Sequence, residues 1–416
     1  MKVFENVKRY VVLACAVIAL LLCVGCAGKL KNPVVELEGA PTGNCAFYSQ
    51  MKNEKTLLKD QRVYGVTISS DGRHMAIHQL FKTDMIINPE NGWQLALDKG
   101  TTFQAFSPDG KALLTSTDEV IRIRALQTGE TIHEWGSLDS PRHVSYSSDG
   151  KMLAYSTKTS VRVINVEDGK LLFERPMEDC VAFFSPDCQR LAVVTKKNVA
   201  GRPFEYITGT IWLLDATVGL FADDELHLYD LASGQTIVDQ TLVDSVAVST
   251  QFSHDGRFLA LGALKDWETA GFGEIRLYDP ASGKTMYSWT APQELRGIAL
   301  SPDGNLLTTY SALRGADMMT YDLVNGRKVQ QFTSEEAAGI MDATYSPDGR
   351  YLAMAIQAYP VGGQGAIVLF DVVNGRVAYS NITQKAIYSV DFFPDGNVLA
   401  ACSEEGVRLI PLTELQ

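Results

Sequence analysis

The amino-acid sequence predicts an all-β fold, a β-propeller of eight four-stranded blades, because one short pattern recurs along the chain. The pattern reads Ser-x-Asp-Gly. It stands between two segments in which apolar and polar residues alternate. A second glycine turn follows 19 to 46 residues later in the first seven copies. Recurrence at roughly 40 residues indicates an array of one supersecondary unit, as in a propeller. The copies begin at Ser69, Ser107, Ser147, Ser185, Ser253, Ser301, Ser346 and Phe393.

The residue types in each copy explain why the chain turns there. Proline suits the second position of a type I turn, aspartate bonds to nearby backbone, and glycine adopts a positive φ. Two copies depart from the pattern: Cys188 takes the place of the glycine, and Phe393 takes the place of the serine. A ring of seven blades is the alternative, if one of the weaker copies packs differently.

Each repeat contains four strand-like segments in a fixed order. In the copy that begins at Ser346, residues 343–345 lead into the first turn and residues 351–353 leave it. A third apolar segment, 367–371, precedes the second turn at Asn374-Gly375, and a fourth segment follows that turn. Successive segments joined in this way form an antiparallel sheet, which is one propeller blade.

The last copy has room for only three strands, at 391–393, 398–401 and 407–410. Near the start of the chain, residues 53–58 resemble the fourth strand of the other copies. We therefore expect the N-terminal strand to complete the last blade and close the ring. Closure removes an exposed sheet edge that would otherwise pair with other chains.

The repeats resemble those of the WD-repeat family and of related bacterial propellers, and the resemblance covers roughly residues 54–412. Aromatic-Asp pairs occupy the place of the family's Trp-Asp, whereas the family's Gly-His pair is absent from every copy. The resemblance implies a β-propeller fold. The pairs are Tyr229-Asp230, Tyr278-Asp279, Tyr321-Asp322 and Phe370-Asp371.

Residues 1–25 are expected to be a lipoprotein signal peptide. Lys2, Lys8 and Arg9 precede 16 mostly apolar residues, which is short for a membrane span of about 20. The segment ends in Leu-Cys-Val-Gly-Cys, which resembles the bacterial lipobox and would make Cys26 the lipidated residue. An ordinary secretory signal and an uncleaved anchor are the alternatives. Each of the three places the remaining chain outside the cytoplasm.

The implied localisation is the bacterial cell envelope, with the chain lipid-anchored to a membrane. The alanine that follows Cys26 is typical of sorting to the outer membrane, facing the periplasm, where a cell has one. Residues 26–53 contain proline, glycine and asparagine and are expected to form a tether. The domain organisation is then a signal peptide at 1–25, a tether at 26–53 and a propeller at 54–416.

Charge argues against a nucleic-acid partner. The chain has 416 residues and a net charge of −12, and removal of residues 1–25 leaves −14. Binding to a phosphate backbone requires clusters of Lys and Arg, which this balance opposes.

Four of the seven cysteines lie beyond the lipidation site. Because closure of the ring would bring the N-terminal segment to the last blade, Cys45 and Cys402 are candidates for a disulfide. Cys180 and Cys188 flank one extended strand and are too far apart to pair with each other. Buried, unpaired thiols are the alternative for all four.

The extra residues of the longer repeats fall mainly between the second and third strands. In a propeller these connections share one face, opposite the Ser-x-Asp-Gly turns. The long connections carry aromatic residues beside charges, which suits a binding interface on a rigid scaffold. The alternative is that the loops pack on themselves and cover the channel. The candidate partner-binding residues are Phe204, Tyr206, Trp267, Phe272 and Tyr359.

The sequence contains no recognisable catalytic, cofactor-binding or metal-binding pattern. There is no Gly-x-Ser-x-Gly, His-Glu-x-x-His, Walker loop or Cys-x-x-Cys, and the six histidines are spread over different repeats. The leading hypothesis is therefore a scaffold that binds an envelope protein through the long loops of repeats four to seven. A hydrolase or lyase with its site at the channel mouth, and a glycan-binding lipoprotein, are the alternatives.

Overall fold

The structure of the protein, a computed structural model, describes residues 54–412 except 80–81, 137–140, 142, 196–223, 244, 266–272, 292–294, 312–315, 335–336 and 359–362. The expected signal peptide and tether lie outside these residues. Within the described residues no helix is long and apolar enough to span a membrane.

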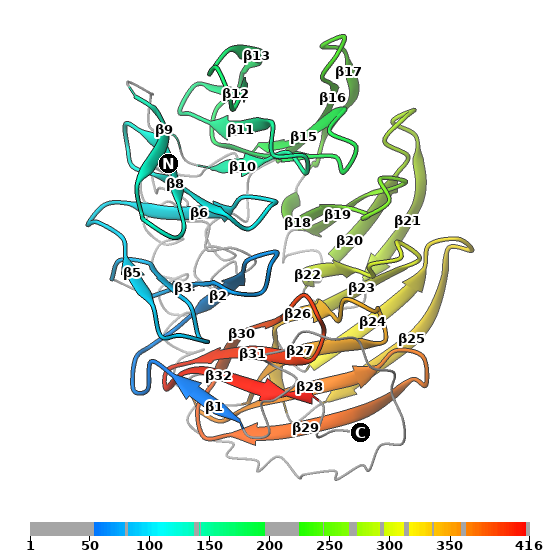
Figure 1. Ribbon diagram of the computed structural model, residues 1–416. Coiled ribbons are helices and arrows are strands. Elements are labelled where there is room, and N and C mark those ends of the chain that lie inside the picture. Colours follow the sequence, from blue (N-terminus) through cyan, green and yellow to red (C-terminus); the bar gives the residue numbers. More distant parts are fainter. Residues whose placement is uncertain are drawn as a thin grey trace, which may run out of the picture.

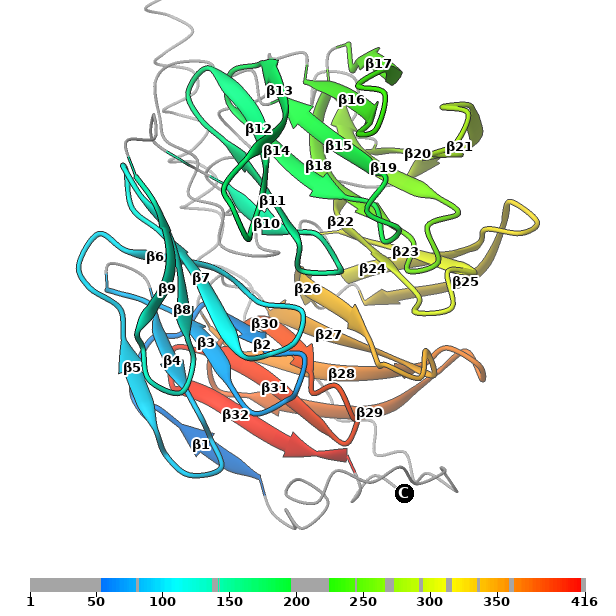
Figure 2. The same ribbon diagram turned by 45° about the horizontal axis from the view of Figure 1, so that its top comes forward.

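The chain forms eight antiparallel sheets of four strands arranged around a central axis (Figures 1 and 2). The prediction of an all-β propeller with eight blades is thus confirmed. Blade one contains β2 (Gly65–Ile68), β3 (Met75–His78), β4 (Met85–Ile87) and β5 (Gln94–Ala96), and blade two contains β6 (Thr102–Phe106), β7 (Ala112–Ser116), β8 (Ile121–Ala125) and β9 (Thr131–Trp135). Blade three contains β10 (Val144–Tyr146), β11 (Met152–Ser156), β12 (Ser160–Asn165) and β13 (Leu171–Pro176). Blade four contains β14 (Cys180–Phe184), β15 (Arg190–Thr195), β16 (Glu225–Asp230) and β17 (Thr236–Thr241). Blade five contains β18 (Ser245–Phe252), β19 (Leu259–Lys265), β20 (Gly273–Tyr278) and β21 (Thr285–Ala291), and blade six contains β22 (Leu295–Leu300), β23 (Leu306–Ser311), β24 (Ala316–Asp322) and β25 (Arg327–Ser334). Blade seven contains β26 (Ala337–Tyr345), β27 (Tyr351–Ala358), β28 (Gly365–Asp371) and β29 (Arg376–Thr383). Blade eight contains β30 (Ile387–Phe392), β31 (Val398–Ser403), β32 (Gly406–Pro411) and β1 (Lys55–Leu57).

Each Ser-x-Asp-Gly turn, which we call a corner, is held by the same hydrogen bonds. In the corner of blade seven, Ser346 Oγ donates to Asp348 Oδ1 (2.5 Å) and accepts from the backbone N–H of Tyr351 (2.9 Å). The aspartate also accepts from the N–H of Arg350 (3.0 Å). The serine is nearly fully buried, and Gly349 adopts a φ of +73°. The corner therefore ends one strand and starts the next without leaving a buried polar group unpaired.

The variant corner at Ser185 has the same backbone geometry as the others. Cys188 adopts a φ of +59°, in the region that favours glycine, and Ser185 Oγ still donates to Asp187 Oδ1 (2.5 Å). The hydrogen bonds of the corner thus impose the turn even where the residue type disfavours it.

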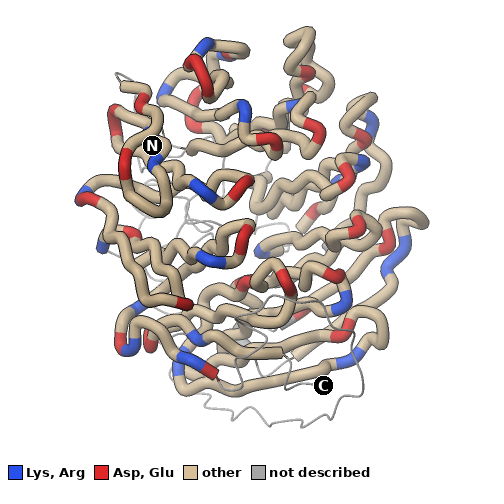
Figure 3. Tube along the Cα trace, in the orientation of Figure 1, with Lys and Arg blue, Asp and Glu red and all other residues tan. Residues whose placement is uncertain are grey.

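The corners lie along one rim of the ring, where neighbours touch. Ser70 Oγ donates to the carbonyl of Pro108 in the next corner (2.9 Å), and Ser148 Oγ donates to that of Pro186 (2.6 Å). Acidic residues recur at these corners around the ring (Figure 3).

The hydrophobic core lies between the blades rather than within a single layer. One cluster joins blades six and seven through Tyr310 and Ile340, and another joins blades seven and eight through Ile367 and Val390. Because each sheet has an apolar face toward each neighbour, a blade buries its surface only when both neighbours are present.

The N-terminal strand closes the ring as predicted. β1 pairs antiparallel with β32, with Lys55 opposite Leu409 and Leu57 opposite Val407. Leu57 packs on the cluster shared by blades eight and one. Just before β1, Glu54 makes an ion pair with Arg408 of β32, which donates two hydrogen bonds to it, one of them 2.8 Å from Nη2 to Oε2. Blade eight therefore combines the two ends of the described chain.

The structure tests the predicted pairing of the cysteines only in part. Cys180, Cys188 and Cys402 form no disulfide with one another, and Cys402 is completely buried in the core of blade eight. Cys45 lies outside the described residues, so the Cys45–Cys402 disulfide stays a prediction.

Candidate functional site

The long connections lie where the sequence places them, between second and third strands. They join β15 to β16 in blade four, β19 to β20 in blade five and β27 to β28 in blade seven. The five candidate partner-binding residues all lie outside the described residues. What the structure does place is the pair of strands from which each connection emerges.

These strands extend the later blades toward the long connections. β26 has nine residues and β27 has eight, whereas the corresponding β2 and β3 have four each. Because the corner fixes one end of every strand pair, the added residues lie at the other end. There Ala337 pairs with Ala358, and Gln357 pairs with Gly365. Blade seven therefore has longer strands than blade one, and the added length lies at the end opposite the corner.

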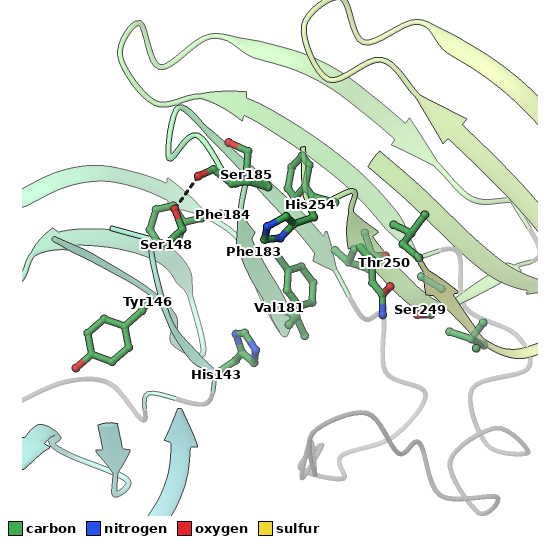
Figure 4. Close-up of a pocket in the computed structure, with 18 of the residues that line it drawn as sticks. His143, Tyr146, Ser148, Val181, Phe183, Phe184, Ser185, Ser249, Thr250 and His254 are labelled. Atoms are coloured by element: carbon green, nitrogen blue, oxygen red, sulfur yellow. Dashed lines mark hydrogen bonds between the residues drawn. The ribbon is translucent and has the colours of Figure 1, made fainter. Parts of the chain in front are cut away.

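A second candidate site is a cavity of about 830 Å³ in the central channel. Its walls are the innermost strands of blades two to six, β6, β10, β14, β18 and β22, with the corners of several of these blades. His143, Tyr146 and Phe183 reach it from blades three and four, and Ser249 and Thr250 reach it from blade five (Figure 4). No residue singled out from the sequence as a binding residue lines this cavity.

The described lining of the cavity is mostly apolar. Among the described lining residues, Arg296 is the only lysine, arginine, aspartate or glutamate. Burial lowers the pKa of His143 to about 4, so this imidazole is neutral at pH 7, and its ring lies 5.6 Å from that of Phe183. His254 lies at the exposed corner of blade five.

Polar side chains near the channel connect several of the blades to the next one in the ring. Asp342 Oδ2 of blade seven accepts hydrogen bonds from Ser389 Oγ (2.9 Å) and the N–H of Val390 (3.1 Å) in blade eight. These bonds satisfy backbone groups on innermost strands, whose inner edge has no neighbouring strand. Other bonds of this kind run from Phe103 N–H to Asp84 (3.1 Å), from Val144 N–H to Gln104 (3.1 Å) and from Ala247 N–H to Asp224 (2.8 Å).

Two carboxyl groups near the channel, those of Asp391 and Asp342, have raised pKa values. Burial, together with the neighbouring charge of Asp342, raises the pKa of Asp391 to about 7. Burial also raises the pKa of Asp342. A titratable pair of this kind could transfer protons, yet Asp342 already accepts hydrogen bonds from blade eight and Asp391 accepts one from the backbone of Ile68 in blade one. Among the described residues no group of three or more His, Cys, Asp or Glu side chains could hold a metal ion.

Comparison with known proteins places the fold among WD-repeat propellers. Residues 379–409, the last strand of blade seven and most of blade eight, match the family model "WD domain, G-beta repeat". The structure is similar to the Dos1 propeller (TM-score 0.63, 14% identity, 86% of this chain and 94% of that one). It is also similar to the C-terminal WD40 domain of Sif2 (TM-score 0.61, 13% identity, 86% and 98%).

One curated relative is similar over a shorter stretch. The hydrazine synthase subunit beta of Kuenenia stuttgartiensis is 29% identical over 105 residues, which is 24% of this chain and 26% of the relative. The chain thus spans about a quarter of the length of that relative.

The raised pKa of Asp391 predicts a pH-dependent stability. In the unfolded chain its pKa returns to 3.8, so between about pH 4 and pH 7 the folded state binds more protons than the unfolded state. This carboxyl therefore lowers the free energy of unfolding progressively as the pH rises through that window. We expect Asp391→Asn to match the wild type at pH 4 and to be more stable at pH 8, by at least about 1 kcal/mol.

Urea denaturation at the two pH values measures this difference. The exposed Asp118→Asn variant is the control and should shift stability equally at both pH values. A difference between wild type and Asp391→Asn that does not grow with pH would contradict the assignment.

Proposed function

We propose that this WD-repeat-like β-propeller is a scaffold that binds a protein partner in the bacterial cell envelope. In this proposal a lipid on Cys26 anchors the chain to a membrane, and the long connections of blades four to seven form the recognition surface. The mechanism is recognition on a preformed support, which lowers the entropic cost of binding because the strands are already ordered.

The asymmetry of the ring is the observation that carries this proposal. The strands of blade seven are about twice as long as those of blade one, and the added length lies on the side of the long connections. A ring that only had to close would not require taller blades on one side. Paired strands hold the ends of each connection in place, which is the arrangement that favours binding loops.

Two further observations support a scaffold. The WD-repeat fold is consistent with a protein-interaction role. The curated relative that matches part of the chain is named as a subunit of an enzyme, and hence as a component of an assembly.

The enzyme alternative has weaker support. An acid–base pair must reach a bound substrate, whereas Asp342 and Asp391 both accept backbone hydrogen bonds that join neighbouring blades. Their perturbed acidity is explained by burial at a blade junction, without a catalytic role. No observation on the described residues favours glycan binding over protein binding.

Replacement of Trp267 and Phe272 by alanine tests the recognition surface. We expect the double variant to lose at least tenfold in capture of a stoichiometric envelope protein, because aromatic anchors dominate interface energetics. The measurement is quantitative pull-down from detergent-solubilised envelope fractions with the full-length protein.

The matched control is the double variant Ile132→Ala, Leu172→Ala, which truncates two exposed side chains on outer strands of blades two and three. Equal capture by the wild type and the Trp267/Phe272 variant, or loss of capture in the control alone, would contradict the assigned face.

Lipid attachment is tested by Cys26→Ser. We expect the variant to incorporate no labelled palmitate and to leave the membrane fraction for the soluble extracytoplasmic fraction, or to remain as an uncleaved precursor, because the thiol is the site of acylation. Cys23→Ser is the control and should retain the label. Undiminished labelling of Cys26→Ser would refute the anchor.

A further inference from the structure

We propose that the channel cavity binds a small organic monocarboxylate with an aromatic body, and that Arg296 holds its carboxylate. This site is separate from the long connections, and the proposal does not depend on the scaffold function. The cavity size of about 830 Å³ lies within the range of roughly 300–1,000 Å³ that is typical of small-molecule sites.

The protein orients the guanidinium of Arg296 but does not provide a hydrogen-bond acceptor for each of its buried nitrogens. The residue stands on β22 in blade six, and its Nε donates to the carbonyl of Met341 in blade seven (3.1 Å). Its Nη2 is buried and has no hydrogen-bond partner in the described part of the chain. A buried charged donor without an acceptor has lost its hydration with nothing in its place, which destabilises the folded protein. A ligand oxygen that accepts from Nη2 would remove this destabilisation.

Among the described residues no carboxylate forms an ion pair with this guanidinium. Asp342 acts on Arg296 through its charge but makes no hydrogen bond to it. The carboxylate of Asp342 accepts from Ser389 and from the backbone of Val390 instead. The guanidinium therefore keeps its fork-like donor geometry for an anion from outside, and carboxylates fit that geometry.

The residues next to Arg296 shape the anion end of the cavity. Gly297 lies under the ring of Tyr310, and a Cβ at this position would overlap the tyrosine hydroxyl. Tyr310 is 6% exposed and lines the cavity, and burial raises its pKa, so the phenol stays protonated. The glycine thus leaves room for a neutral hydroxyl that lies close enough to Arg296 to interact with its charge.

The other side of the cavity suits a flat apolar body. His143, Tyr146 and Phe183 present ring surfaces from blades three and four, and the low pKa of His143 keeps its ring uncharged (Figure 4). Aromatic rings stack favourably on such surfaces. Burying the ligand ring there removes apolar surface from water, which favours binding.

The charge balance selects a monoanion over a phosphate. The part of the lining that the structure describes contains one arginine and no lysine, and the neutral His143 adds no positive charge. A phosphate dianion usually requires several cations or a nest of backbone N–H groups. One guanidinium matches one carboxylate.

Titration with 2-naphthoate tests the proposal, with the neutral isostere 2-naphthamide as the matched ligand. By isothermal calorimetry on the intact protein, we expect naphthoate to bind with a Kd below 1 mM and at least tenfold more tightly than the amide. In Arg296→Gln the naphthoate Kd should rise at least tenfold, and that of the amide should change less than threefold.

The exposed Arg327→Gln variant is the control for a lost positive charge and should bind as the wild type does. If Arg296→Gln does not fold, the carboxylate-to-amide preference of the wild type decides alone. Absence of naphthoate binding at 1 mM, equal affinity for the two ligands, or wild-type affinity in a folded Arg296→Gln would overturn the proposal.

Discussion

The hydrogen bond from the corner serine to the corner aspartate connects the repeated sequence to the ring. In seven of the eight blades the serine hydroxyl donates to the aspartate at 2.5–2.7 Å. The same oxygen accepts from the backbone five residues later, so the turn ends and the second strand begins at a fixed point. Because all corners share this geometry, their strands leave in equivalent directions and the sheets pack around one axis.

A fixed corner leaves the opposite end of each blade free to vary. Strand length and loop length change there, between the short β2 and β3 and the long β26 and β27, without disturbing the corners. The innermost strands have one unpaired edge, and side chains such as Asp342 satisfy it from the preceding blade. The channel that remains between these edges contains the cavity bordered by Arg296.

Local patterns in the sequence predicted the corners, the number of blades and the closing strand. The corners depend on residues that are near each other in the chain, and the blades and the closing strand follow from a count of the repeats and of their strands. Even the variant corner at Cys188 follows from its neighbours Ser185 and Asp187. The cavity could not be predicted in the same way. Its lining comes from five blades separated by long stretches of sequence, and the partner of Arg296 is a backbone carbonyl, which leaves no signature in residue type.

A double-mutant cycle on one corner measures the interaction that the account depends on most directly. Ser346→Ala, Asp348→Ala and the double variant are compared with the wild type by urea denaturation, which gives the coupling free energy between the two side chains. A direct hydrogen bond to a charged group predicts a coupling of about 1.5–3 kcal/mol. Additive effects, with no coupling beyond error, would mean that serine and aspartate act independently and would contradict the role assigned to the corner.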